Sequence, residues 1–272
     1  MLATLRGYAG LMRIPNGLIA IVSLWAASIA ETRSLAPRVR ILLGAAAVFL
    51  ILGGGNALND YFDWQIDAVN KPGRPIPSGR VARAGAGRFA ALLFAGGLAA
   101  SLALPVAALA LAGLNAGLLI LYAGRSKKML VLANALVAWM TASVFLFAAA
   151  ILGRLGLPVA ALAASAFFIM MTREILKDIE DVEGDRRAGA ATIPIRWGAG
   201  RARIAANLLI APAVLALVPP FVTGALGGRS GMLILLAGAS LATSLALPAA
   251  GAQKVVKAAT VVVLLAFAAG SL

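Results

Sequence analysis

The chain carries Asn59-Asp60-Tyr61-Phe62-Asp63-Trp64-Gln65-Ile66-Asp67 and, about 118 positions later, Lys177-Asp178-Ile179-Glu180-Asp181-Val182-Glu183-Gly184-Asp185. In both stretches, aspartates stand at positions i, i+3 and i+7. On a helix with 3.6 residues per turn, this spacing puts three carboxylates on one face within about 60° of arc. Each stretch therefore predicts a helix that presents one acidic face.

Acidic residues are almost confined to these two places. The chain has ten of them, and all but Glu31 lie in Asp60–Asp67 or Glu174–Asp185. Carboxylates on one helix face repel one another unless a cation lies between them, and solvated helices usually mix charges at i, i+4. Oxygen ligands suit Mg²⁺, which proteins hold with a few carboxylates plus substrate phosphates. The repeated spacing favours two Mg²⁺-binding faces over two solvated helix ends.

Composition limits the class of protein. The chain has 272 residues, of which 62% are hydrophobic and 12% charged, and its mean hydropathy is +0.96. These values predict an all-α, polytopic membrane protein rather than a soluble domain. The absence of Cys and His excludes disulfides, thiolate nucleophiles, imidazole bases and typical zinc sites.

Nine apolar segments are long enough to span a bilayer. They lie near 14–31, 40–63, 85–104, 105–122, 130–152, 157–179, 203–225, 230–249 and 254–271. The apolar run after Arg13 lacks a processing site, so no cleaved signal is expected. We expect one domain over 1–272, with about nine helices around a central cavity.

Basic residues indicate the orientation. With the N-terminus inside, the cytoplasmic segments hold 19 Lys and Arg and the outer segments hold 5. This asymmetry predicts a cytoplasmic N-terminus in the cell membrane and, with nine spans, a C-terminus outside. The net charge of +14 is then explained by loops facing anionic lipid, and no nucleic-acid partner is expected.

The two acidic stretches suggest an internal duplication. Each ends a span, the second and the sixth, on the cytoplasmic side, and each precedes a polar loop rich in basic residues. We expect two pseudo-repeated four-helix halves, about 1–125 and 126–250, followed by one extra span. Repeats of this kind usually place a site where the halves meet, here a cleft with two metal-binding walls.

Other polar residues are candidates for the same site. Asn56 and Asn134 lie inside apolar spans, where an unpaired amide is costly, so both are expected to face the bundle interior. Lys127 and Lys128 are either positive flanking charges or cations that bind a diphosphate. The glycines at 53–55 follow no strand, and they indicate close helix packing or room for a ligand chain rather than a phosphate loop.

Two acidic walls, cations and an apolar cavity suit a diphosphate on a long isoprenoid tail. Metal ions clamp the diphosphate and neutralise charge as the allylic C–O bond breaks. An apolar pocket protects the allyl cation, which the faces of Tyr or Phe can stabilise. The expected partners are therefore a prenyl diphosphate, a lipophilic acceptor and the bilayer.

The two motifs resemble the aspartate-rich motifs of the UbiA-type intramembrane prenyltransferases, and the nine-span layout is similar over nearly the whole chain. Within that superfamily, the second motif from Arg173 to Asp185 and the segment Asn70-Lys71-Pro72-Gly73-Arg74-Pro75-Ile76-Pro77-Ser78-Gly79 are similar to those of archaeal digeranylgeranylglyceryl phosphate synthases. The segment around Arg74 also occurs in quinone and chlorophyll-type members.

The resemblance implies Mg²⁺-dependent transfer of a geranylgeranyl group to the hydroxyl of geranylgeranylglyceryl phosphate, the second ether bond of archaeal lipid, with two Mg²⁺ ions expected. We expect four catalytic and metal-binding residues, Asp60, Asp63, Asp178 and Asp181, and four further metal ligands, Asn56, Asn59, Asp67 and Asp185. The expected substrate-binding residues are Arg13, Asn16, Tyr61, Arg74, Tyr122, Lys127, Lys128, Asn134 and Lys177.

The sequence is also compatible with two other functions. An aromatic prenyltransferase acting on 4-hydroxybenzoate or another quinone precursor is the second possibility. A cation-coupled transporter is a third, although its carboxylates belong near the bilayer midplane rather than at span ends. No general base is evident, and an Asp, the departing pyrophosphate or water are the groups that remain.

Overall fold

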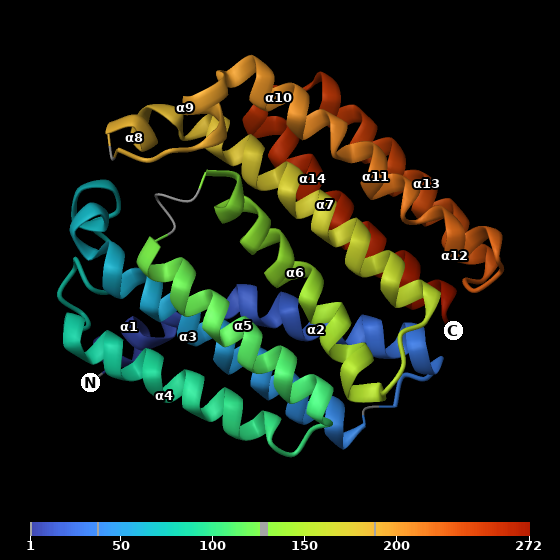
Figure 1. Cartoon of the computed structure of the whole chain (residues 1–272), viewed down its shortest axis with the longest axis horizontal. Helices are drawn as coiled ribbons and strands as arrows, with labels where there is room; N and C mark the ends of the chain where they lie inside the picture. The colour runs from blue at the N-terminus through green and yellow to red at the C-terminus, as the bar shows by residue number, and fades with distance from the viewer. Residues whose placement is uncertain (1, 37, 126–129, 188) are drawn as a thin grey trace. The chain divides into compact units, whose positions relative to one another are not determined.

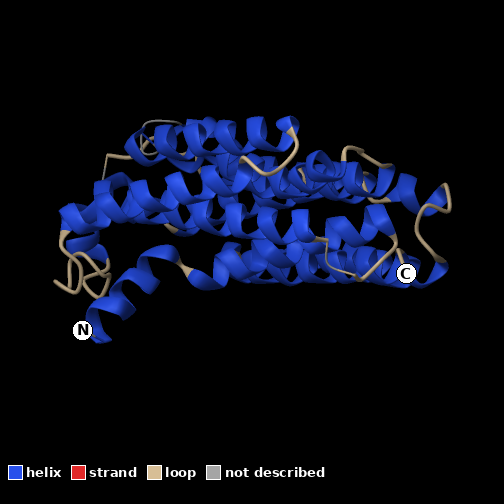
Figure 2. Cartoon of the chain, turned by 90° about the horizontal axis from the view of Figure 1, so that it is seen from below, coloured by secondary structure: helices blue, strands red, loops and turns tan. Residues whose placement is uncertain are grey.

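The computed structural model describes residues 2–36, 38–125, 130–187 and 189–272, and every regular element in these ranges is a helix. Figures 1 and 2 show this helical architecture. The prediction of an all-α membrane protein is confirmed. By chain contacts the protein divides into two compact units, one comprising Met1–Val22 and Pro37–Ser126, the other Ser23–Ala36 and Lys127–Leu272.

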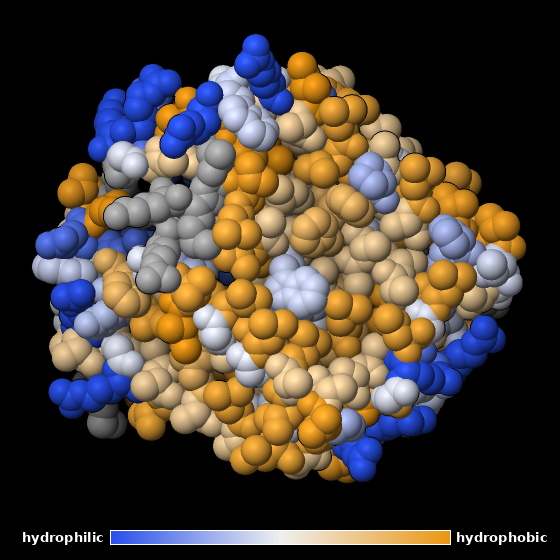
Figure 3. Space-filling view, in the orientation of Figure 1, coloured by the Kyte–Doolittle hydropathy of each residue, from blue (hydrophilic) through white to orange (hydrophobic). Residues whose placement is uncertain are grey.

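Eight helices in the described residues are long and apolar enough to cross a membrane. They lie at Ile14–Thr32, Val39–Val69, Arg83–Ser101, Val106–Gly124, Val131–Leu152, Leu157–Glu180, Ala199–Val222 and Ala249–Gly270. The remaining expected span, near 230–249, is a shorter apolar helix over Ser230–Ala246. In Figure 3, apolar side chains cover the flanks of the helices, and hydrophilic residues gather toward their ends.

The first unit is built around one long helix. Its elements are α1 (Leu2–Met12), the first part of α2 (Ile14–Thr32), α3 (Val39–Asn70), α4 (Arg83–Ser101) and α5 (Val106–Arg125). Helix α3 packs against α1, α4 and α5. Glycines bring α3 and α4 together: a Cβ on Gly54 would lie 3.1 Å from Phe94 Cδ2, and one on Gly97 would lie 2.6 Å from Ile51 Cγ1. The glycines at 53–55 thus serve close helix packing.

The second unit is arranged around α7. Its elements are the end of α2, α6 (Leu130–Leu152), α7 (Leu157–Glu180), α8 (Val182–Arg187), α9 (Ile193–Trp197), α10 (Ala199–Leu208), α11 (Ile210–Leu215), α12 (Val218–Val222), α13 (Gly228–Thr243), the 3₁₀ turn η2 (Ser244–Ala246) and α14 (Ala249–Gly270). Helix α7 packs against α6, α14, α10 and α11. Proline causes the breaks in the predicted span at 203–225: Pro212 lies in α11, Pro219 and Pro220 lie in α12, and none of them can donate a backbone hydrogen bond.

A buried carboxylate joins two elements of the second unit. Glu31, near the end of α2, is 7% exposed. Its Oε1 accepts a 2.6 Å hydrogen bond from the backbone N–H of Gly156, and its Oε2 lies 3.2 Å from Arg154 Nε. Gly156 is the N-cap of α7. Glu31, the one acidic residue of the sequence outside Asp60–Asp67 and Glu174–Asp185, therefore ties the end of α2 to the start of α7.

Candidate active site

The first aspartate motif lies on the last three turns of α3, which stays helical through Asn70. Asp60 and Asp67 are buried, with exposures of 3% and 6%. One guanidinium nitrogen, Arg74 Nη1, lies 3.2 Å from Asp60 Oδ1 and 2.5 Å from Asp67 Oδ2. The two carboxylates therefore share a helix face, as their spacing predicts.

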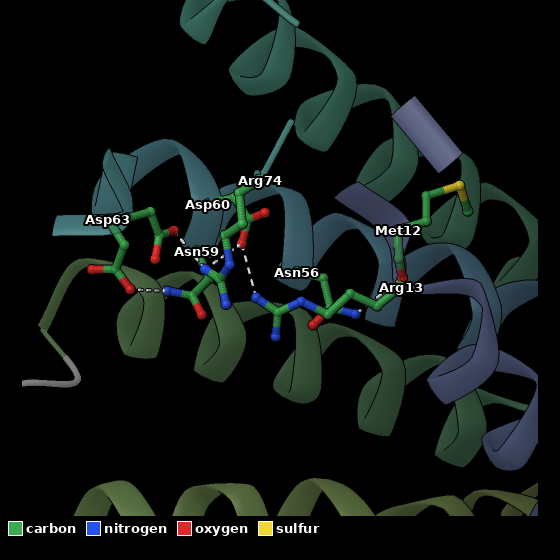
Figure 4. A network of polar contacts seen from close by, with 8 residues as sticks. Met12, Arg13, Asn56, Asn59, Asp60, Asp63 and Arg74 are labelled. Atoms are coloured by element: carbon green, nitrogen blue, oxygen red, sulfur yellow. Dashed lines mark hydrogen bonds and ion pairs between the residues drawn. The ribbon is translucent and has the colours of Figure 1, made fainter. Parts of the chain in front are cut away.

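A second arginine contacts the same motif. Arg13 Nη2 lies 2.8 Å from Asp60 Oδ1, so this one oxygen accepts hydrogen bonds from both Arg13 and Arg74 (Figure 4). Asn59 Nδ2 donates a 2.6 Å hydrogen bond to Asp63 Oδ2. The two arginines were expected to bind substrate, and in the structure they neutralise aspartates.

The turn between α1 and α2 aims Arg13 at the motif. Arg13 has φ +51°, a left-handed backbone conformation that is uncommon for non-glycine residues. Asn56 Nδ2 donates a 3.1 Å hydrogen bond to the Met12 carbonyl oxygen, which holds the end of α1 against α3. Asn56 was expected to be a metal ligand, but its amide nitrogen faces this carbonyl.

The loop between α3 and α4 holds Arg74. The backbone N–H of Ser78 donates to the Arg74 carbonyl at 3.0 Å, and that of Val81 donates to the Pro75 carbonyl at 3.1 Å. Arg80 donates within the same loop, to the carbonyl of Gly73 and to Ser78 Oγ. These bonds make the loop a compact platform for the guanidinium.

The second motif spans two helices. Asp178 lies near the end of α7, is 9% exposed, and accepts a 2.8 Å hydrogen bond from Asn134 Nδ2 of α6. The amide of Asn134 thus faces the unit interior, as expected. Asp181 follows the last residue of α7 with φ −89° and ψ 3°, and Asp185 lies on α8. The expectation of one continuous helix is wrong here, although the Asp185 N–H still bonds to the Asp181 carbonyl at 3.0 Å.

Glu174 is a buried acidic residue that the sequence did not single out. It is 8% exposed, and its carboxylate lies 2.7 Å from Arg173 Nη1 and 3.4 Å from Lys177 Nζ. It stands four residues before Asp178, so the same helical period that marks the motif could have included it. Lys177, which was expected to bind substrate, here contacts Glu174.

The remaining candidates are dispersed. The ring of Tyr61 stacks under the guanidinium of Arg83, with 4.4 Å between Cζ and the ring centroid, and Arg83 Nε donates to the Tyr61 carbonyl at 3.1 Å. Asn16 is exposed on α2, and Tyr122 is half-buried on α5. Lys127 and Lys128 lie outside the described residues.

The donor set of the first motif suits a hard cation. In the described ranges, no group of three or more acidic side chains is already gathered as a metal site. Nevertheless, Arg74 Nη1 lies between Asp60 and Asp67, within hydrogen-bond distance of both. A positive charge therefore fits between these carboxylates, and oxygen-only ligands favour Mg²⁺.

These features define a class: a polytopic helical membrane enzyme with carboxylates and cations at the ends of two of its spans. The chain belongs to the UbiA prenyltransferase family, whose model matches residues 19–270. It is therefore a prenyltransferase that crosses the membrane several times.

Within this family, the chain is similar to particular relatives and solved structures. The chain is 42% identical over 241 residues to the digeranylgeranylglyceryl phosphate synthase of Methanopyrus kandleri, covering 86% of this chain and 88% of that one. A solved structure described as "Structural and mechanistic insights into the biosynthesis of Digeranylgeranylglyceryl phosphate synthase in membranes" has a TM-score of 0.85 at 31% identity, with 98% of each chain covered. A UbiA homologue from Archaeoglobus fulgidus, bound to DMAPP and Mg²⁺, shares the fold with a TM-score of 0.71 at 17% identity, over 96% of this chain and 97% of that one.

Proposed function

We propose that this prenyltransferase transfers a geranylgeranyl group from geranylgeranyl diphosphate to the free hydroxyl of geranylgeranylglyceryl phosphate. The observation that carries the proposal is the likeness, over 86% of the chain, to a relative that bears the corresponding synthase name. The product would be the second ether bond of an archaeal lipid.

The reaction exchanges one C–O bond for another. The bond between C1 of the prenyl group and the diphosphate oxygen breaks, and pyrophosphate leaves with the electron pair. The acceptor hydroxyl oxygen bonds to C1, and its proton passes to the departing pyrophosphate, an Asp or water. The difficult part is the charge that develops on the leaving diphosphate, and cations are the groups that stabilise it.

Carboxylates of both motifs would hold Mg²⁺, which would supply positive charge to the diphosphate when bound. In the first motif, Asp60, Asp63 and Asp67 are the proposed ligands, with Asn59 holding the Asp63 carboxylate in place. In the second, Asp178 is held by Asn134, and Asp181 and Asp185 complete the set. Arg13 and Arg74 provide charge-assisted donors for phosphate oxygens.

The acceptor is tested by offering two different ones. Purified full-length protein with Mg²⁺ and labelled geranylgeranyl diphosphate is given the glyceryl phosphate ether in one reaction and 4-hydroxybenzoate in another. We expect labelled diether phosphate in the first reaction only, and omission of Mg²⁺ should abolish it. Product from 4-hydroxybenzoate alone would replace this proposal with an aromatic prenyltransferase.

We also propose that both motifs face the cytoplasm. The support is the 19 to 5 distribution of Lys and Arg between the loops of the two sides. Prenyl diphosphates carry several negative charges and do not cross a bilayer unaided, so the motifs must lie on the side where this substrate is present.

A further inference from the structure

The first motif already contains cations. Asp60 Oδ1 accepts from Arg13 and from Arg74 (Figure 4). Asp67 Oδ2 also accepts from Arg74. Two buried carboxylates are therefore neutralised by guanidinium groups from two separate segments, the α1–α2 turn and the α3–α4 loop. Without these partners, each carboxylate would be a buried charge at a large energetic cost.

A metal ion and these guanidinium groups compete for the same oxygens. Mg²⁺ binds oxygen at about 2.0–2.1 Å in octahedral geometry, closer than any hydrogen bond. Arg74 Nη1 lies between Asp60 Oδ1 and Asp67 Oδ2, at 3.2 and 2.5 Å. A metal that takes these two oxygens displaces Arg74 from between them, and at Asp60 Oδ1 it also competes with Arg13.

A displaced guanidinium needs another anion. A diphosphate offers oxygens that match the fork of the guanidinium, which makes strong paired hydrogen bonds to phosphate. Both side chains can reach an incoming ligand, because they are 32% and 24% exposed while the aspartates that they cover are buried. The exchange would replace one set of ion pairs by another without leaving any charge unpaired.

The backbone around the two arginines favours movement of side chains rather than of segments. A Cβ on Gly7 would lie 2.7 Å from Val81 Cγ2, and one on Gly10 would lie 3.1 Å from Pro75 Cγ, so α1 packs tightly on the loop that carries Arg74. Leu11, Ile76 and Val81 belong to one buried apolar cluster. Arg13 and Arg74 thus extend from a single packed platform.

We propose that Arg13 and Arg74 are exchangeable counter-ions: they neutralise Asp60 and Asp67 before substrate binds and transfer to the diphosphate when the metal takes the carboxylates. Metal and diphosphate then bind cooperatively, each strengthening the other by the same factor. This inference rests on the metal-dependent prenyl transfer proposed above and adds a role for the two arginines.

The exchange predicts opposite effects of one substitution on two binding constants. In Arg13→Gln and Arg74→Gln, Mn²⁺ used in place of Mg²⁺ should bind alone more tightly than to the wild type, because a competing cation is gone. The same variants should lose most of the gain that inorganic pyrophosphate gives to Mn²⁺ binding, a gain expected in the wild type to be about 5- to 150-fold. If an arginine did no more than bind the phosphate, its removal would not tighten the binding of Mn²⁺ alone.

Equilibrium dialysis of radioactive Mn²⁺ against the purified full chain, at fixed free Mn²⁺ with and without inorganic pyrophosphate, measures both constants. Arg6→Gln is the matched control, because Arg6 is an exposed arginine of α1, and it should behave as the wild type. Arg74→Lys keeps a positive charge and should bind Mn²⁺ alone with nearly wild-type affinity.

Thermal unfolding provides a check that does not depend on dialysis. Arg74→Gln should unfold at a lower temperature than the wild type without metal, and added Mn²⁺ should restore more of the stability than it adds to the wild type. Unchanged or weaker binding of Mn²⁺ alone in both arginine variants would overturn the exchange. Absence of Mn²⁺ binding to the wild type, even with pyrophosphate, would instead overturn the proposed metal-dependent function.

Discussion

Asp178 depends on one amide from a neighbouring helix. Asn134 donates to Asp178 Oδ2 at 2.8 Å, and both side chains are buried. We expect Asn134→Ala to lower activity and metal affinity about 10- to 100-fold, as is typical when a group that orients a metal ligand is removed.

The aspartates themselves should matter more than the amide that orients one of them. Turnover should be abolished by each of four substitutions, Asp60→Ala, Asp63→Ala, Asp178→Ala and Asp181→Ala, and partly lost in Asp67→Ala and Asp185→Ala.

The control for these variants is Glu183→Gln. Glu183 lies between the aspartates of the second motif but is exposed, and it pairs only loosely with Arg186, at 3.6 Å. Steady-state rates with both substrates should be nearly unchanged. Full activity after loss of either whole motif would contradict the requirement for both.

Helical periodicity predicted the positions of some side chains of the site. It placed Asp60 and Asp67 on one face, and Arg74 contacts both. It could not reveal that Arg13 pairs with Asp60, because Arg13 stands at the α1–α2 turn in a left-handed conformation, and no glycine at that position marks the turn. Side-chain partners over 47 residues of sequence separation depend on packing that spacing does not encode.

The close packing of α3 against α4 can be tested by substituting a glycine at their contact. A Cβ on Gly97 would lie 2.6 Å from Ile51 Cγ1 and 3.1 Å from the Ala47 carbonyl oxygen, so Gly97→Ala must push the helices apart. We expect a loss of about 1–3 kcal/mol in the free energy of unfolding, typical of overpacking. Gly113→Ala on α5 has open space at its Cβ and should instead stabilise by about 0.5–1 kcal/mol.

Unfolding in mixed micelles measures both changes. Equal effects of the two substitutions would mean that glycine acts only through helix propensity, and the close approach of α3 and α4 would have no energetic importance.

Helix existence was easier to predict than helix continuity. Apolar length identified the spans, and the prolines account for the breaks in Ala199–Val222. The interruption at Asp181 carries no such signal, since neither proline nor glycine stands at that position. It places Asp185 on a separate short helix, α8, although the i, i+7 spacing alone predicted a shared face.

In the whole molecule, α13 decides on which side of the membrane the C-terminus lies. The apolar segment Ser230–Ala246 would be about 25 Å long as a helix, against a hydrocarbon core of about 30 Å, so it is at the lower limit for a span. We expect it to cross, which puts Leu272 outside, while the distribution of Lys and Arg predicts Leu155 outside and Ser78 and Gly200 inside. The expected duplication of halves near 1–125 and 126–250 stays a prediction.

Single-cysteine labelling tests this topology, since the chain has no cysteine of its own. An impermeant thiol reagent applied to right-side-out vesicles should modify Leu155→Cys and Leu272→Cys but not Ser78→Cys or Gly200→Cys. Leu272 is chosen because it is 66% exposed, whereas Ser271 is buried. Protection of Leu272→Cys alone would mean that α13 does not cross. Labelling of Ser78→Cys would place the first motif outside.

The contact between Glu31 and the start of α7 has a consequence for synthesis. Gly156, which donates to Glu31, is 125 residues later in the chain. At about 5–20 residues per second, a ribosome adds that length in about 6 to 25 seconds. During this interval the Glu31 carboxylate has neither Arg154 nor Gly156 as a partner. The end of α2 therefore makes this contact only after Gly156 has been synthesised, so assembly of the second unit waits until α3 to α6 have been translated.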